Sequence, residues 1–334
     1  DATTSGQTCI HNYRMKTEEA YLSWIGAGLG IGVQGGLTIL FSKPDILLDI
    51  AEGWDFYRNY LNTTPRMKGN QINTWNGQWL KRKYDINDSS SLLDFDSAFS
   101  SKEKKGEKKS DLVEIQTLPW VDLIAAVSRR FPDPRMMGYV YNIGQTNTTI
   151  GFIPFVLSPI RKVHDLYEHH FGTKNSKKAM KLFGTAFGFA MACKEGVIGL
   201  KALEPKGLSS LMKKGKIPSY KQEEKLKYET YQIWLLAMLN NEELWSRANE
   251  FARALDSFRK GQGKDRTNRD NAIEELLAHP SKQSVVRNVY PILKDAEEEE
   301  RETIMDVIKI IHDMPAENVP YFIALTKIHH VILR

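Results

Sequence analysis

The stretch from residue 24 to residue 41 reads Trp24-Ile25-Gly26-Ala27-Gly28-Leu29-Gly30-Ile31-Gly32-Val33-Gln34-Gly35-Gly36-Leu37-Thr38-Ile39-Leu40-Phe41. It places six glycines in an apolar run, and three interpretations compete for it. Gly30 to Gly35 matches the dinucleotide-binding pattern G-x-G-x-x-G. The length and the G-x-x-x-G spacings are typical of a transmembrane helix. The third interpretation is structural, with glycines placed where backbone packs closely against backbone or against a nucleic-acid strand.

The sequence around this stretch favours the structural interpretation. A dinucleotide site needs a strand before the first glycine and a helix after the last, in a βαβ unit. Gly26 and Gly28 weaken any preceding strand, and no βαβ alternation follows. The run reaches spanning length only when its glycines and Gln34 are counted, and no second hydrophobic segment or signal peptide accompanies it.

Composition indicates a globular protein in a reducing compartment. The 334 residues suffice for two domains, and 41% hydrophobic with 26% charged residues is ordinary. Cys9 and Cys193 are the only cysteines and lie far apart in sequence, so no disulfide framework is expected and a cytoplasmic location is favoured.

Positive charge is concentrated in one segment. Residues 161 to 227 hold 15 lysines and arginines against 6 acidic residues, whereas residues 228 to 334 hold 14 against 18. A concentrated basic segment suits a polyanion, because neutralised phosphates release counterions. A solvated lysine-rich face is the alternative.

Two further segments carry groups suited to nucleic acid. Residues 66 to 84 interleave amides, two tryptophans and the basic triplet Lys81-Arg82-Lys83, which could stack on bases and neutralise phosphates or could form a polar turn. Residues 138 to 157 predict two strands around a loop that is rich in neutral amides and hydroxyls. Such groups suit hydrogen bonding to base edges.

The remaining pattern predicts an α+β fold, with a mixed N-terminal domain followed by a C-terminal antiparallel helical bundle. Helices are expected at 44–61, near 118–130 and through the C-terminal third, where apolar residues recur every three or four positions. The predicted domains are 1–220, in which 85–111 is a mobile surface loop, and 221–334.

The chain resembles the large subunit of type I CRISPR surveillance complexes, most closely those of subtype I-B. The resemblance lies in residues 24–41, in Lys68-Gly69-Asn70-Gln71 with Trp75-Asn76-Gly77-Gln78-Trp79-Leu80, and in Met314-Pro315-Ala316-Glu317-Asn318-Val319-Pro320-Tyr321-Phe322. It implies a non-catalytic subunit of an RNA-guided complex, which reads the protospacer-adjacent motif in duplex DNA and supports R-loop formation through a helical C-terminal domain. The guide RNA reads most of the target by base pairing. The implied partners are double-stranded target DNA, guide RNA and other protein subunits, with no membrane.

The chain departs from that family in its metal motifs. Many relatives carry paired C-x-x-C zinc motifs, but here Cys9-Ile10-His11 offers too few ligands, since a structural zinc site uses four. His164 and Glu168 are one helical turn apart, which we interpret as a surface helix end. No metal, cofactor or catalytic constellation is expected, because the chain has no P-loop, nucleophile elbow or H-E-x-x-H motif.

The site predictions follow from these segments. The residues expected to read the DNA motif are Gln145, Asn147, Thr148, Asn70, Gln71 and Asn76. The residues expected to contact phosphates are Lys81, Arg82, Lys83, Arg129, Arg130, Lys177, Lys178, Lys181, Lys213 and Lys214. Two alternatives stay open: an RNA- or single-strand-binding accessory protein, and a nucleotide-binding enzyme that uses Gly30 to Gly35.

Overall fold

A computed structural model gives the fold of the chain. It describes residues 16–84, 98–101, 112–131, 135–142, 148–213, 217–261, 266–278 and 280–334. Two compact units emerge from the contacts: the first comprises Asp1–Arg161 with Phe187–Ala202, and the second comprises Lys162–Ala186 with Leu203–Arg334. The predicted domain boundary after residue 220 falls, in sequence, within the second unit.

The glycine-rich stretch folds into the end of helix α1 (Thr17–Gly28) and a β-hairpin of β1 (Ile31–Val33) and β2 (Leu37–Phe41). Gly35 and Gly36 form the turn with φ angles of 102° and 76°, a left-handed backbone that glycine adopts without steric cost. The segment that matches G-x-G-x-x-G therefore ends in an antiparallel hairpin rather than opening a helix, so it lacks the strand–turn–helix geometry of a dinucleotide site. In the described part of the chain, no helix is both long enough and apolar enough to cross a lipid bilayer.

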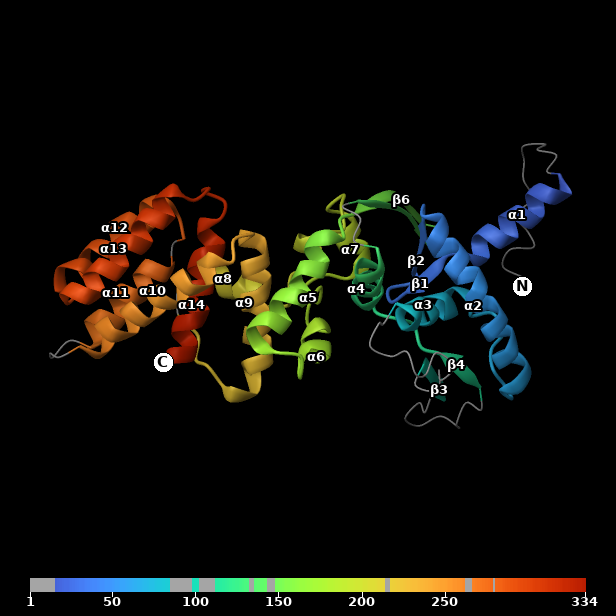
Figure 1. Ribbon diagram of the computed structural model, residues 1–334, viewed down its shortest axis with the longest axis horizontal. Coiled ribbons are helices and arrows are strands. Elements are labelled where there is room, and N and C mark those ends of the chain that lie inside the picture. Colours follow the sequence, from blue (N-terminus) through green and yellow to red (C-terminus); the bar gives the residue numbers. More distant parts are fainter. Residues whose placement is uncertain are drawn as a thin grey trace. The chain divides into compact units, whose positions relative to one another are not determined.

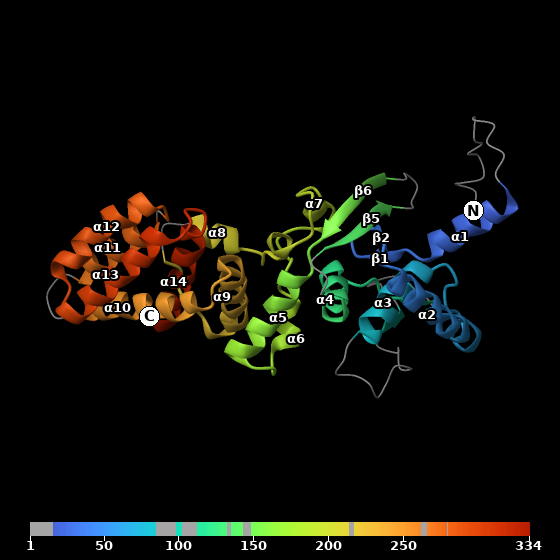
Figure 2. The ribbon, with the colours of Figure 1, turned by 45° about the horizontal axis from the view of Figure 1, so that its top comes forward.

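The hairpin continues into a four-stranded antiparallel sheet with β5 (Met136–Asn142) and β6 (Thr148–Phe155), in the order β1-β2-β5-β6. Its inner face is apolar and buried, as at Ile39, Val140 and Ile153 on three of the strands. Helices α3 (Ile72–Lys83) and α4 (Trp120–Arg130) lie on one side of this sheet (Figures 1 and 2). The opposite face carries an aromatic cluster, described below, and the predicted strands around the 143–147 segment are confirmed.

Two helices form the core beside the hairpin. Helix α2 (Pro44–Thr63) begins at the expected proline and is two residues longer than predicted. Helix α3 (Ile72–Lys83) packs on α2 and β1. Trp75 and Trp79 are buried in this contact, and their indole N–H groups donate to the carbonyls of Gly53 and Asp49 at 2.8 and 2.7 Å. Most of the segment considered a possible polar turn is thus a helix with a packed aromatic face.

The first unit also contains shorter elements. Strands β3 (Phe99–Ser101) and β4 (Val113–Ile115) pair antiparallel, followed by α4 (Trp120–Arg130) and α7 (Phe189–Cys193). The prediction of one mobile loop over 85–111 is wrong at 99–101, which form β3. Residues 85–97 and 102–111 lie outside the described residues.

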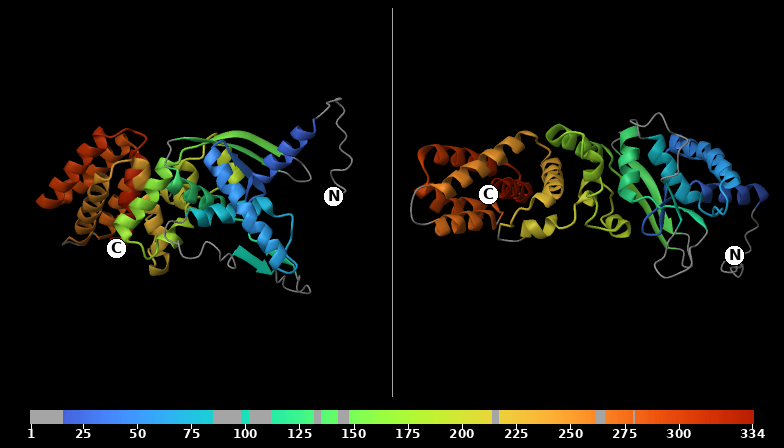
Figure 3. Two further views of the ribbon diagram at one scale, coloured as in Figure 1. Left: turned by 45° about the vertical axis from the view of Figure 1, so that its right-hand side comes forward. Right: turned by 90° about the horizontal axis from the view of Figure 1, so that it is seen from below.

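The second unit is largely helical, which confirms the α+β class with a packed C-terminal helical region. Its elements are most of α5 (Ser158–Phe171), α6 (Ser176–Met180), α8 (Leu208–Lys213), α9 (Lys225–Leu239), α10 (Glu243–Lys260), α11 (Arg266–Ala278), α12 (Lys282–Asp295), α13 (Glu298–Asp313) and α14 (Val319–Leu333), with the 3-10 turns η2 (Leu200–Leu203, at the boundary between the units) and η3 (Gln222–Glu224). Helices α10 to α13 lie side by side, and α14 packs between α9 and α10 (Figures 1 and 3).

Helix ends in this region follow from local chemistry. Ser281 caps α12 by accepting a hydrogen bond from the Ser284 amide at 3.2 Å. The Asn241 side chain accepts one from the Glu243 amide at 3.1 Å, at the start of α10. Pro291 lies inside α12, whose buried face includes Val289 and Ile292 on either side of it.

Candidate functional site

The structure places the predicted base readers of the first unit in different environments. Asn76 is fully buried: its amide donates to the carbonyls of Gly28 and Gly30 at 2.7 and 2.8 Å and accepts from the Trp54 indole at 3.1 Å. It therefore cannot present its amide to a base edge, and this prediction is wrong. The physical reason is that a buried polar group must find its hydrogen-bond partners within the protein, and the Asn76 amide uses its groups for these partners.

Gln71 is also committed to the fold. Its side chain bonds both backbone groups of Ile115, accepting from the amide at 3.0 Å and donating to the carbonyl at 3.3 Å. This amide bonds to β4 as another strand would, and Gln71 is half-buried. Its assignment as a base reader stays a prediction. Asn70 is exposed and stays a candidate.

The predicted reading loop between β5 and β6 is only partly described. Thr148 begins β6 opposite Asn142, and its backbone alone is described. Gln145 and Asn147 lie outside the described residues. Their assignment to sequence reading stays a prediction.

The basic groups of the first unit are partly neutralised by acids. Lys81 lies 3.1 Å from Asp122, and Lys83 bridges Asp49 at 2.9 Å and Glu52. The pKa of Lys83 is raised by its two carboxylate partners, although partial burial opposes the shift.

The arginines predicted to accompany these lysines are arranged differently from one another. Arg130 is exposed and lies over the Phe131 ring at 5.5 Å. Arg82 and Arg129 are half-buried. A continuous phosphate-binding stripe is therefore not formed by this set in the described residues.

The basic segment of the second unit is different because its described predicted phosphate-contact lysines are exposed. Lys177, Lys178 and Lys181 are exposed on and just after α6, and α6 packs against α9. Lys213 is exposed at the end of α8, and Lys214 lies outside the described residues. Lys225 and Lys227 on helix α9 are also exposed.

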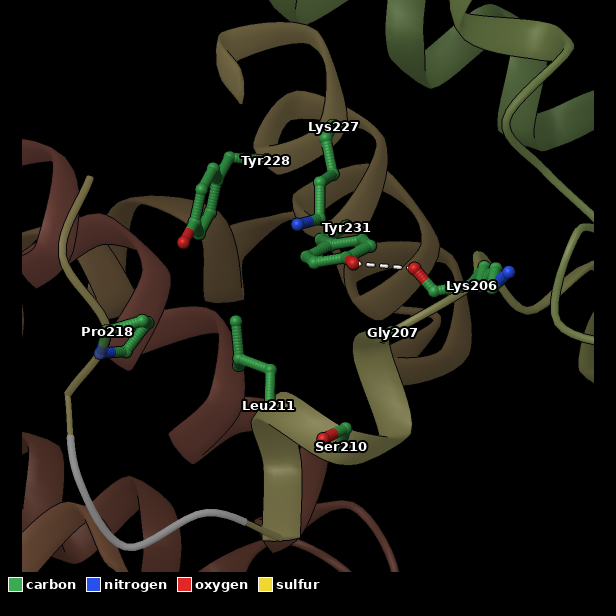
Figure 4. A pocket seen from close by; sticks show the side chains of 8 residues that line it. All are labelled: Lys206, Gly207, Ser210, Leu211, Pro218, Lys227, Tyr228 and Tyr231. Atoms are coloured by element: carbon green, nitrogen blue, oxygen red, sulfur yellow. Dashed lines mark hydrogen bonds between the residues drawn. The ribbon is translucent and has the colours of Figure 1, made fainter. Parts of the chain in front are cut away.

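A pocket of about 470 Å³ lies beside this contact. Its lining residues are Lys206, Gly207, Ser210, Leu211, Pro218, Lys227, Tyr228 and Tyr231 (Figure 4). A second cavity of about 300 Å³ shares Lys206, Lys227 and Tyr231 with it. No Asp or Glu is among the described residues that line either cavity, so both favour an anionic or neutral ligand.

Hydrogen bonds hold the pocket walls in place. The Tyr231 hydroxyl donates to the Lys206 carbonyl at 2.7 Å (Figure 4), and the Lys206 amide donates to Thr185 Oγ1 at 3.0 Å. The amide of Gly184 donates to the Leu203 carbonyl at 2.8 Å, which ties the two chain segments of this unit together. The site is thus built before any ligand arrives.

Charge and aromatic faces meet in this pocket. The Lys227 ammonium lies 5.9 and 5.8 Å from the ring centroids of Tyr228 and Tyr231, within cation–π range, and 2.9 Å from Glu224. Burial raises the pKa of both tyrosines, that of Tyr231 to about 12, so their hydroxyls stay protonated at neutral pH.

Sequence reasoning missed this pocket as a site. The apolar periodicity of the C-terminal third predicts a helix over this segment but does not assign a ligand to Tyr228 or Tyr231. The one available signal was the position of two tyrosines directly after the basic segment.

The metal-like cluster at the end of α5 does not form a site of three or more ligands. His164 Nε2 lies 3.5 Å from Glu168 and 3.1 Å from the Ser176 hydroxyl. Within the described ranges, no group of three or more histidine, cysteine or acidic side chains could hold a metal ion. Cys9 and His11 lie outside those ranges.

Comparison with models of protein families, with curated proteins and with solved structures finds no match to this chain.

Proposed function

We propose that this chain is the non-catalytic large subunit of a cytoplasmic, RNA-guided type I CRISPR surveillance complex, which binds duplex target DNA and reads its protospacer-adjacent motif. The sequence resemblance suggests this function. An α+β region followed by a packed helical region is compatible with the helical C-terminal domain that the resemblance implies.

The observation that carries the proposal is the exposed lysine group at the α6–α9 contact, namely Lys177, Lys178 and Lys181. Exposed lysines on a helix that packs into its unit suit phosphate contacts, which supply affinity independent of sequence. In an RNA-guided complex such affinity suffices for most of the target, because base pairing supplies the specificity.

A lysine exchange tests this proposal. In the variant K177Q/K178Q/K181Q, duplex affinity should fall for all sequences alike, and the slope of log K against log salt should flatten by about three units. The matched control K260Q/K294Q/K309Q removes the same charge from α10, α12 and α13 and should keep the wild-type slope. Equal slopes in all three proteins would exclude the α6 lysines from the interface.

A second candidate function, single-strand binding, is favoured by the outer face of the sheet. Tyr139 lies 5.5 Å from Tyr141 and 5.0 Å from Phe152 between ring centroids, and Phe152 is 73% exposed. Exposed aromatic rings on a rigid sheet are suited to stacking on unpaired bases. Phe152→Ala should lower affinity for single strands about fivefold or more, whereas Tyr290→Ala, at a comparable exposure of 70%, should not.

A further inference from the structure

The pocket beside α9 combines features that one class of ligand would use together. Leu211, Pro218 and the Tyr228 ring give it apolar walls, and Ser210, Lys206 and Lys227 are among its polar lining residues (Figure 4). Tyr228 and Tyr231 are almost wholly buried, so their rings are fixed walls rather than mobile surface groups.

The cation at this pocket is aimed inward. In Figure 4 the Lys227 ammonium points toward the Tyr231 ring and the pocket interior, whereas the Lys206 ammonium points away from Tyr228. Lys206 nonetheless lines both cavities, so its positive charge stands at their common wall. A ligand would therefore meet an apolar slot, one inward cation and a second cation at the rim.

Backbone geometry fixes the rim. Gly207 has a φ of 90°, and a Cβ at this position would lie 2.8 Å from the Tyr231 hydroxyl. Only glycine allows the chain to turn here while Tyr231 keeps its bond to the Lys206 carbonyl. A site preformed in this way loses little conformational freedom on binding.

We propose that this pocket binds one unpaired nucleotide, with its base against the Tyr228 side of the slot and its phosphate on Lys227. The volume lies within the range of small-molecule sites. A flat aromatic body suits the apolar walls, and a lysine ammonium pairs with phosphate as a point charge. The proposal rests on the proposed function only in taking the nucleotide from a DNA or RNA strand, because a free mononucleotide offers the same chemistry.

The test compares blunt duplex DNA, the same duplex with a three-nucleotide overhang, the overhang with abasic sites, and adenosine monophosphate. Ser210→Trp fills the pocket from an exposed position without removing a core side chain. Lys227→Gln removes the cation, and Lys309→Gln is its matched control, since both lysines pair with an acid three residues earlier at 2.9 Å. Fluorescence anisotropy measures strand binding, and calorimetry measures mononucleotide binding.

We expect wild-type protein to prefer the overhang over the blunt and abasic duplexes by about fivefold or more. Ser210→Trp and Lys227→Gln should remove this preference, and Lys309→Gln should keep it. Binding of adenosine monophosphate alone, lost in Ser210→Trp, would also support the pocket and would identify a free nucleotide as its ligand.

Two results would overturn the proposal. In the first, the wild-type protein neither prefers the overhang duplex nor binds adenosine monophosphate. In the second, the preference for the overhang survives in Ser210→Trp. The proposed function fails separately. If duplex binding depends on the α6 lysines but the protein neither prefers the overhang nor binds adenosine monophosphate, only the pocket proposal fails. If adenosine monophosphate binds but no nucleic acid does, only the proposed function fails.

Discussion

Asn76 joins three parts of the first unit through one side chain. It satisfies the carbonyls at the end of α1 and before β1, and it accepts the indole proton of Trp54 from α2. Asn76 itself is fully buried, where an unpaired polar group costs about 1–3 kcal/mol.

Asn76→Ala should therefore lower the free energy of unfolding by about 2 kcal/mol or more, because it removes the Asn76 donor from the Gly28 carbonyl and the acceptor from the Trp54 indole. The Gly30 carbonyl still accepts from the Asn73 amide. Urea denaturation followed by far-UV circular dichroism measures the change. Asn70→Ala, at an exposed position, should stay within about 0.5 kcal/mol of wild type. Equal midpoints for both variants would refute the structural role of Asn76.

At the residue scale, the sequence predicted the types of residue in a nucleic-acid site but not which of them are buried. The types Asn, Gln, Lys and Arg were suited to nucleic acid, but type does not reveal burial. Asn76 and Gln71 bond to segments far away in the sequence, such as Gly30 and Ile115, and local patterns carry no information on such partners.

Among elements, the contact between α2 and α3 depends on a glycine. A Cβ at Gly53 would lie 2.6 Å from the Trp79 ring, so Gly53→Ala should cost about 1–3 kcal/mol through overpacking. Gly26→Ala is the matched control: no atom lies within 4 Å of its Cβ position in α1, and alanine favours a helix by about 1 kcal/mol. The melting temperature should thus fall in Gly53→Ala and rise in Gly26→Ala. A change of the same sign in both variants would contradict the α2–α3 packing.

Helix α14 introduces a pH dependence through His329. This histidine is packed against Trp245 and lies 3.2 Å from the Gln232 amide, and burial lowers its pKa to about 4, with smaller contributions from His170 and Arg253. Because the unfolded state binds a proton near pH 6.5 and the folded state does not, stability present above pH 6.5 is lost as the pH falls toward 4.

Full titration of this one group corresponds to about 3 kcal/mol. His329→Gln should flatten the dependence of unfolding free energy on pH between 6.5 and 4 by about this amount. The control, His312→Gln at an exposed position, should retain the wild-type profile. If the pH dependence of the unfolding free energy is unchanged in His329→Gln, protonation of other groups causes the loss of stability at low pH.

The sequence predicted helices and strands better than it predicted the environments of single residues. Apolar spacing of three and four predicted α2, α4 and α9, although α9 proves to be buried on nearly every side. The period of two predicted β5 and β6. Helix α3 was harder to predict, since its buried face consists of Trp75, Asn76 and Trp79 among polar residues, and α12 continues through Pro291 because packing outweighs one lost hydrogen bond.

For the whole molecule, the α+β order of the chain followed from the sequence, whereas the make-up of the compact units did not. Residues 187–202 belong to the first unit although residues 162–186 belong to the second. Such an interleaved path depends on contacts between distant segments, for example between Phe155 and Ile198. The gathering of lysines around α6 and α9 is a property of this same tertiary arrangement.

The central claim is that the chain acts as a subunit of an RNA-guided DNA-binding complex. Its most direct test is isolation of the full-length chain from its own cells at low salt, with sequencing of bound RNA and mass spectrometry of bound proteins. We expect RNA of defined length, several protein partners in fixed proportion, and binding of the isolated complex to duplex DNA that matches the RNA. A chain that elutes alone and without RNA would contradict it.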